Sequence, residues 1–188
     1  MKRFLITTSC ALLLLGVGAF VACDESESTS TAGTTFEKMV MDFDYEVSAD
    51  LFEVADLQLI TTDPEGISAT DTLTKVDWDK QFISTELPTG FSVQVVATLK
   101  ESVELTKDRY QLACTAIDEF REYRSDGKVH WHQKADKEHL EVAVTRGDST
   151  PEALRSEIEE ALTLFNKSFT YIVTANETGG GYDVEKNE

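Results

Sequence analysis

The stretch Met39-Val40-Met41-Asp42-Phe43-Asp44-Tyr45-Glu46-Val47 decides the fold class. Its odd positions are all apolar, and its even positions from 42 to 46 are all acidic. A period of two is typical of a β-strand with one buried and one solvated face. The segment 91–99 repeats the alternation, again with apolar side chains on every odd position. The chain is therefore expected to be mainly β.

Turn sequences separate the other expected strands. Asp63-Pro64-Glu65-Gly66 and Leu87-Pro88-Thr89-Gly90 contain the proline and glycine that turns favour. Asp126-Gly127, between two β runs, indicates a hairpin. The remaining strands are expected at 51–61, within 70–87, and at 109–124, 129–133, 140–144 and 169–175.

One segment, 150–166, has the pattern of an amphipathic helix. Thr150 is a suitable N-cap, and Pro151 suits the first helical position. Five apolar residues then share one stripe: Leu154, Ile158, Ala161, Leu162 and Phe165. Seven or eight strands with this helix before the last one predict an antiparallel β-sandwich, similar in architecture to the immunoglobulin and fibronectin group.

The first 23 residues have the layout of a secretory signal peptide. Lys2-Arg3 is the positive region, 4–22 is an apolar run, and Cys23 follows it. Phe20-Val21-Ala22-Cys23 resembles a bacterial lipobox, whose cysteine receives fatty acyl chains such as palmitate and becomes the first mature residue. Simple signal cleavage and a retained transmembrane helix are the alternatives, since about 19 apolar residues can also cross a bilayer. We expect lipidation at Cys23.

The residues after Cys23 bear on location. Asp24-Glu25-Ser26-Glu27-Ser28 is acidic, and 29–35 is rich in serine and threonine. This arrangement resembles Bacteroidota surface lipoproteins, in which such acidic residues act as an export signal. The resemblance implies a lipid anchor in the outer membrane and a domain that faces the cell exterior. The same residues would also suit an ordinary disordered linker.

These features divide the chain into four parts. A lipoprotein signal peptide is expected over 1–22 and an acidic, Ser/Thr-rich tether over 23–36. A single β-sandwich domain is expected over 37–176, and its length of about 140 residues is enough to bury a core. A flexible tail is expected over 177–188, because it begins with three glycines and is otherwise polar.

The charge balance limits the partners. The chain has 17 Lys and Arg against 35 Asp and Glu, a net charge of −18. Such a surface repels phosphate backbones and anionic lipid head groups, so no nucleic acid partner is expected. Contact with the membrane is expected through the lipid anchor alone. Cys114 is the one cysteine left in the mature domain once Cys23 is acylated, and we expect it to be a buried small hydrophobe.

His130-Trp131-His132 is the local cluster that could bind a metal. Strand alternation places both histidines on one side, and His139, Asp136 or Glu138 could complete a site. The stronger zinc signatures Cys-x-x-Cys and His-Glu-x-x-His do not occur in the sequence, so we favour a solvated strand face. No metal and no cofactor are expected.

Aspartates on strand faces could also hold calcium, which prefers several oxygen ligands. The candidate groups are Asp42 and Asp44 with Asp63, or Asp77 with Asp79. The sequence contains no Asp-x-Asp-x-Asp-Gly loop, and a chain this acidic is expected to carry aspartates on its strands.

Trp131 and Tyr123 are the candidate ligand-binding residues, because aromatic faces stack on sugar rings; Trp78 and Tyr182 are weaker candidates. No nucleophile elbow, phosphate loop or dinucleotide fingerprint occurs in the sequence. We therefore expect a non-enzymatic surface lipoprotein with a binding or assembly role, whose partner is a glycan or an envelope protein. The alternatives are a small metal-dependent hydrolase that uses His130 and His132, and a structural subunit of a surface assembly.

Overall fold

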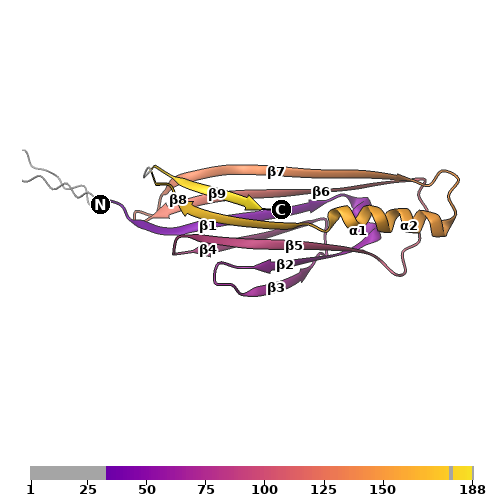
Figure 1. Ribbon diagram of the computed structural model, residues 1–188, viewed down its shortest axis with the longest axis horizontal. Coiled ribbons are helices and arrows are strands. Elements are labelled where there is room, and N and C mark those ends of the chain that lie inside the picture. The colour runs from indigo at the N-terminus through magenta and orange to yellow at the C-terminus, as the bar shows by residue number, and fades with distance from the viewer. Residues whose placement is uncertain (1–32, 178–179, 188) are drawn as a thin grey trace, which may run out of the picture. The chain divides into compact units, whose positions relative to one another are not determined.

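The computed structural model describes residues 33–177 and 180–187. The expected signal peptide, Cys23 and the tether as far as residue 32 lie outside these ranges. Within them, strands β1 to β9 form two antiparallel sheets that face each other across a shared apolar core (Figure 1). The predicted antiparallel β-sandwich is confirmed.

One sheet has four strands in the order β4-β1-β6-β7, and the other has five in the order β3-β2-β5-β8-β9. The four strands of the first sheet are β1 Phe36–Val47, β4 Asp77–Ser84, β6 Arg109–Arg124 and β7 Val129–Thr145. The five strands of the second are β2 Ala55–Thr62, β3 Ser68–Thr72, β5 Thr89–Leu99, β8 Ser168–Ala175 and β9 Tyr182–Asn187. The pairs β2-β3, β6-β7 and β8-β9 are hairpins of strands consecutive in the sequence, while the other paired strands are not consecutive.

The core follows the two-residue pattern of the sequence. The odd positions of β1 from Met39 to Val47 are buried, as are those of β5 from Phe91 to Ala97. Phe43 lies at the centre, with four other rings between 5.4 and 6.5 Å from its own: Trp78, Phe91, Phe169 and Tyr171. Removing each such ring from water contributes about 2 kcal/mol, so this aromatic cluster is a main source of stability.

A short helix, α1 (Ala49–Val54), occupies the start of the segment expected to be a strand from residue 51. Ser48 begins it, because its Oγ accepts the backbone N–H of Leu51 at 3.1 Å. The Asp50 carboxylate accepts the N–H of Gln111 in β6 at 2.6 Å and fixes the helix against that strand. The prediction was wrong here because these side-chain acceptors replace strand pairing over one turn.

β7 is one long strand, where two short ones were expected at 129–133 and 140–144. The polar residues between those segments stay paired with β6: His139 lies opposite Thr115, and Asp136 lies opposite Asp118. Register shifts between Asp118 and Phe120 and between Glu122 and Tyr123 in β6 accommodate the extra length. β7 is thus continuous, although its middle is charged.

The helix before the last strands is confirmed. α2 spans Pro151–Leu162 and is followed by the 3-10 turn η1 at Thr163–Phe165. Thr150 is its N-cap, since its Oγ1 accepts the N–H of Ala153 at 3.3 Å. Its apolar stripe is buried, as predicted, at Leu154, Ile158, Ala161, Leu162 and Phe165.

The expected flexible tail over 177–188 is wrong for Tyr182–Asn187, which forms β9 and pairs with β8. Tyr182, Val184 and Lys186 alternate with polar residues and face the first sheet. β9 therefore covers the side of the core between β7 and β8.

The long strands give the domain two distinct ends (Figure 1). At the hairpin end, the turn between β6 and β7 lies beside the start of the domain, because Ser125 N–H donates to the Thr35 carbonyl at 2.9 Å. At the helix end lie α1 and α2. β6 has 16 residues and, at about 3.3 Å per residue, is about 50 Å long. The helix end is thus held well away from Phe36, where β1 begins.

Candidate binding groove

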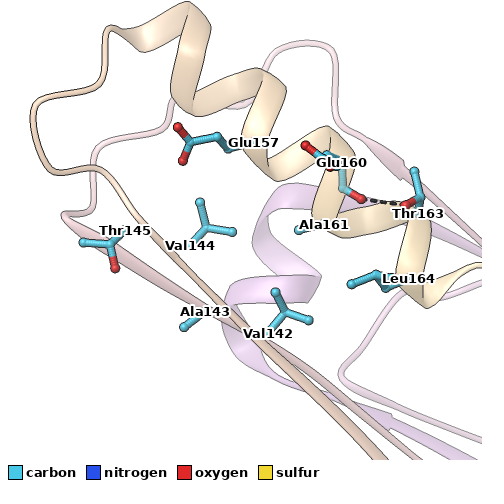
Figure 2. Close-up of a pocket in the computed structure, with 9 residues that line it drawn as sticks. All are labelled: Val142, Ala143, Val144, Thr145, Glu157, Glu160, Ala161, Thr163 and Leu164. Atoms are coloured by element: carbon cyan, nitrogen blue, oxygen red, sulfur yellow. Dashed lines mark hydrogen bonds between the residues drawn. The ribbon is translucent and has the colours of Figure 1, made fainter.

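A groove of about 370 Å³ lies at the helix end, between β7 and α2 (Figure 2). It is lined by four consecutive β7 residues, Val142, Ala143, Val144 and Thr145, and by Glu157, Glu160, Ala161, Thr163 and Leu164. Side chains from both faces of β7 contribute, so the groove follows the edge of the strand. The groove therefore has a partly apolar lining beside an open strand edge.

The groove exposes a sheet edge. β7 is the last strand of its sheet, and none of the described strands pairs with its outer side. Alternate backbone N–H and C=O groups of an edge strand point away from the sheet and can pair with another extended chain. The groove thus combines main-chain donors and acceptors with side-chain contacts.

The groove has both apolar and acidic lining residues. Leu164 after α2 is 52% exposed, while Ala161 of α2 and Val144 of β7 are buried. Glu157 and Glu160 lie on the outer surface of α2 beside them (Figure 2). A ligand in the groove would meet apolar surface and two carboxylates, an environment that suits alternating apolar and basic side chains.

Three contacts hold the helix wall against the second sheet. The Asn166 Oδ1 accepts the backbone N–H of Ala97 in β5 at 2.7 Å. The Arg155 guanidinium donates to the carbonyl of Lys100 at 3.0 Å. The apolar stripe of α2 supplies the third contact, since it is buried in the common core. The groove is therefore preformed, with one wall on each sheet.

Trp131, a candidate for ligand stacking, is half-buried and packs inside the fold. Its ring lies 5.1 Å from that of Tyr182 in β9, at an angle of 66°. Burial and a hydrogen bond to the carboxylate of Glu122 raise the pKa of Tyr182 to about 12. The structure thus gives Trp131 an internal partner.

Tyr123, the second candidate, is on the opposite face of β6 from the core. The ammonium of Lys38 lies 5.3 Å from the centre of its ring. Tyr123 and Trp131 therefore do not form one aromatic platform. Trp78 is part of the core cluster, with its ring 6.5 Å from Phe43.

His130 and His132 lie at the hairpin end, and each imidazole is engaged by a carboxylate. His130 Nε2 is 3.0 Å from Asp126, and His132 Nε2 is 2.6 Å from Glu119. His139 lies 3.0 Å from the Thr115 hydroxyl. Among the described residues, no group of three or more His, Cys, Asp or Glu is placed to hold a metal ion. The structure does not bring the candidate ligands His130, His132 and His139 together.

The acidic strand faces form pairs other than those considered for calcium. Asp44 lies directly opposite Asp79 in β4. Burial, followed by repulsion from Asp79 and Asp42, raises the pKa of the Asp44 carboxyl. Asp63 instead accepts the N–H of Ile67 within its own turn at 2.8 Å. Like charges directly opposite each other on paired strands cost stability, so the Asp44–Asp79 pair is expected to be destabilising.

Cys114 is buried, as predicted, on the core side of β6. Burial raises the pKa of its thiol. A thiol in this state is a poor nucleophile, which agrees with its role as a small apolar side chain.

Sequence reasoning missed charged residues on the core-facing rows. Asp118 falls on the same row of β6 as Leu112 and Phe120 and is only 3% exposed. Glu138 shares a row of β7 with Leu140, and Lys186 occupies the inward row of β9. The alternation itself identifies Asp118, because it interrupts an otherwise apolar row. β9 was not predicted, so Lys186 could not be placed.

The chain matches no model of a known protein family and no curated protein. None of the described helices is long and apolar enough to cross a membrane.

Proposed function

We propose that this chain is a non-enzymatic surface lipoprotein that binds an extended segment of an envelope protein in the groove between β7 and α2. The observation that carries the proposal is the open edge of β7 beside an exposed apolar patch. Strand addition to such an edge supplies main-chain hydrogen bonds, and the adjacent side chains supply selectivity. This requires no catalytic group.

Charge favours a basic segment. Glu157 and Glu160 line the helix wall, and the whole chain carries a net charge of −18. A second copy of the same chain would bring a like charge to the groove, which disfavours self-association. We therefore assign to the partner an extended segment in which apolar residues alternate with lysine or arginine.

The N-terminal sequence supports export and anchoring. Under the proposal, Cys23 carries the fatty acyl chains, and the domain is held at the outer face of the outer membrane by the tether. The helix end is remote from Phe36, where β1 begins (Figure 1). A groove in that position would face away from the membrane and be open to a partner.

A defined peptide tests the groove. The purified full chain is titrated with a fluorescent, acetylated decapeptide of alternating valine and lysine, and binding is followed by anisotropy. Leu164→Asp removes apolar contact and adds a charge in the groove lining, and we expect it to weaken binding about tenfold, or about 1.4 kcal/mol. Glu157→Gln combined with Glu160→Gln should also weaken binding, and more strongly at low salt.

Ile83→Asp is the matched control, because Ile83 is a comparably exposed apolar residue on β4, away from the groove. It should leave the affinity unchanged. A peptide of alternating valine and glutamate should bind poorly to every variant. Equal binding of the valine-lysine peptide to the parent chain and to Leu164→Asp would show that the groove is not the binding site.

The anchor is tested separately by metabolic labelling with a palmitate analogue. The parent chain should be labelled, and Cys23→Ala should not. The hydrolase alternative based on His130 and His132 stays a prediction, and metal analysis of the purified chain decides it: a stoichiometric bound ion would favour that alternative.

A further inference from the structure

Three charged side chains from different strands meet inside the sandwich. Asp118 extends from β6, Glu138 from β7 and Lys186 from β9. The Lys186 Nζ lies 3.4 Å from Glu138 Oε2 and 3.8 Å from Asp118 Oδ2. The second distance is longer than a hydrogen bond, so the amine lies beside the Asp118 carboxyl in non-bonded contact.

The surroundings of the amine are largely aromatic. The Lys186 Nζ is 5.9 Å from the ring centre of Phe169 and 5.8 Å from that of Tyr171. The Tyr171 hydroxyl donates to Asp118 Oδ2 at 3.0 Å and orients that carboxyl. Amine and carboxyl are therefore held in a partly dry site by groups from three strands.

Glu138 is placed to move a proton. Its Oε1 is bound by the ammonium of Lys167, so Oε2 is the oxygen directed toward Lys186. Burial is the main cause of a raised pKa at Asp118, which favours the neutral acid. A neutral carboxylic acid beside an amine with an adjacent proton acceptor is the reactive combination for amide formation.

We propose that Lys186 and Asp118 become joined by an intramolecular isopeptide bond, with Glu138 as the proton carrier. The inference is independent of the proposed binding function, because it concerns the interior of the fold.

The reaction balances without a further reagent. Glu138 takes a proton from the Lys186 ammonium, and the freed electron pair of Nζ attacks Cγ of the protonated Asp118 carboxyl. The tetrahedral carbon then loses its hydroxyl group, which leaves as water with the proton from Glu138, and Nζ passes its second proton to the Glu138 carboxylate, which is left protonated. One N–C bond forms, one C–O bond breaks, and one water molecule is released.

The fold holds the Lys186 amine close to the Asp118 carboxyl, and this proximity favours the condensation. Condensation of a free acid and amine is unfavourable in water, but groups held in contact behave as though present at about 10⁵ M or more. The inward rows of β6 and β9 are fixed by their own sheets before the bond forms. The product joins the last strand to the opposite sheet, so β9 can no longer separate from the first sheet.

Intact mass of the full chain, purified from the cells that produce it, tests the bond. Relative to Lys186→Arg, and after the arginine difference is subtracted, the parent should be lighter by one water, about 18 Da. Digestion should yield a single branched peptide that contains both Asp118 and Lys186. Lys186→Arg keeps the positive charge, so the folded state can be checked by circular dichroism before the masses are compared.

Further variants assign the roles. Asp118→Ala should abolish the mass loss, and Glu138→Gln should abolish it in a chain that still folds. Asp118→Asn should lose ammonia, about 17 Da, in place of water.

Lys80→Arg is the matched control, because Lys80 also faces an aspartate across the two sheets, with its Nζ 3.9 Å from Asp71, in a more exposed site. It should keep the full mass loss. A parent chain of unmodified mass, or a mass loss that survives Lys186→Arg, would show that the cluster is an ion pair alone. A mass loss that survives Glu138→Gln would overturn the role of that residue.

Discussion

The two ends of the domain use their unusual residues in opposite ways. At the hairpin end, the residues that stand out in the sequence have internal partners: Trp131 packs on Tyr182, and His132 meets Glu119. At the helix end, ordinary residues of an amphipathic helix and a strand leave Leu164 exposed beside an open edge. A rare residue type in the sequence is thus a weaker sign of a binding site than an exposed apolar side chain beside an unpaired strand edge.

The largest expected effect separates structural from binding roles. Trp131→Ala should lower the free energy of unfolding by about 2 kcal/mol, below the 3–5 kcal/mol of a fully buried tryptophan because the ring is half-buried. Leu164→Ala, at the helix end, should change it by less than about 0.5 kcal/mol. Urea denaturation of both variants measures the difference. Equal losses of unfolding free energy at the two positions would show that Trp131 and Leu164 do not differ in their structural role.

A smaller effect is expected from the support of the groove wall. Asn166→Ala removes the acceptor for the backbone N–H of Ala97 in a half-buried site and should cost about 1–2 kcal/mol. Because Asn166 follows η1, the loss should also loosen the groove and weaken binding of the valine-lysine peptide. Thermal denaturation and the anisotropy titration measure the two consequences. Weakened stability with unchanged binding would show that the wall does not need this contact.

The smallest effect concerns charge at the hairpin end. The backbone N–H of Lys128, followed by His130, lowers the pKa of Asp126 below its usual value. The ionised form of Asp126 is thus favoured in the folded state. Its contribution to the stability of the fold is present above about pH 4 and is lost as pH falls through the lowered pKa. Asp126→Asn should lower the melting temperature by about 1 °C at pH 7. The difference should vanish near pH 2, and a difference that grows on acidification would contradict this sign.

Much of the fold was predictable, because its strands and helix have strong periodic patterns. The apolar rows of β1 and β5 and the Thr150-Pro151 start of α2 all appear in the sequence. The continuity of β7 was not predictable, since Asp136 and Glu138 in its middle resemble a loop. The inward position of Glu138 depends on Lys167 and Lys186, which lie far along the chain.

The candidate site was harder to predict than the fold. Each lining segment, 142–145 and 157–164, looks like an ordinary amphipathic element, and the groove exists only where the two meet. The two histidines do share the outward side of β7, but Glu119 comes from another strand, and no local pattern predicts that contact. Alternation predicts the direction of a side chain, and only the assembled sheets show what it meets.

Photocrosslinking in intact cells distinguishes the helix end from the hairpin end as the place where a partner binds. A photoreactive phenylalanine analogue is placed at position 164 in one chain and at position 132 in another. We expect a discrete envelope-protein adduct from position 164, joined through a basic, extended segment, and none from position 132. An adduct from position 132 alone would show that the partner binds at the hairpin end instead.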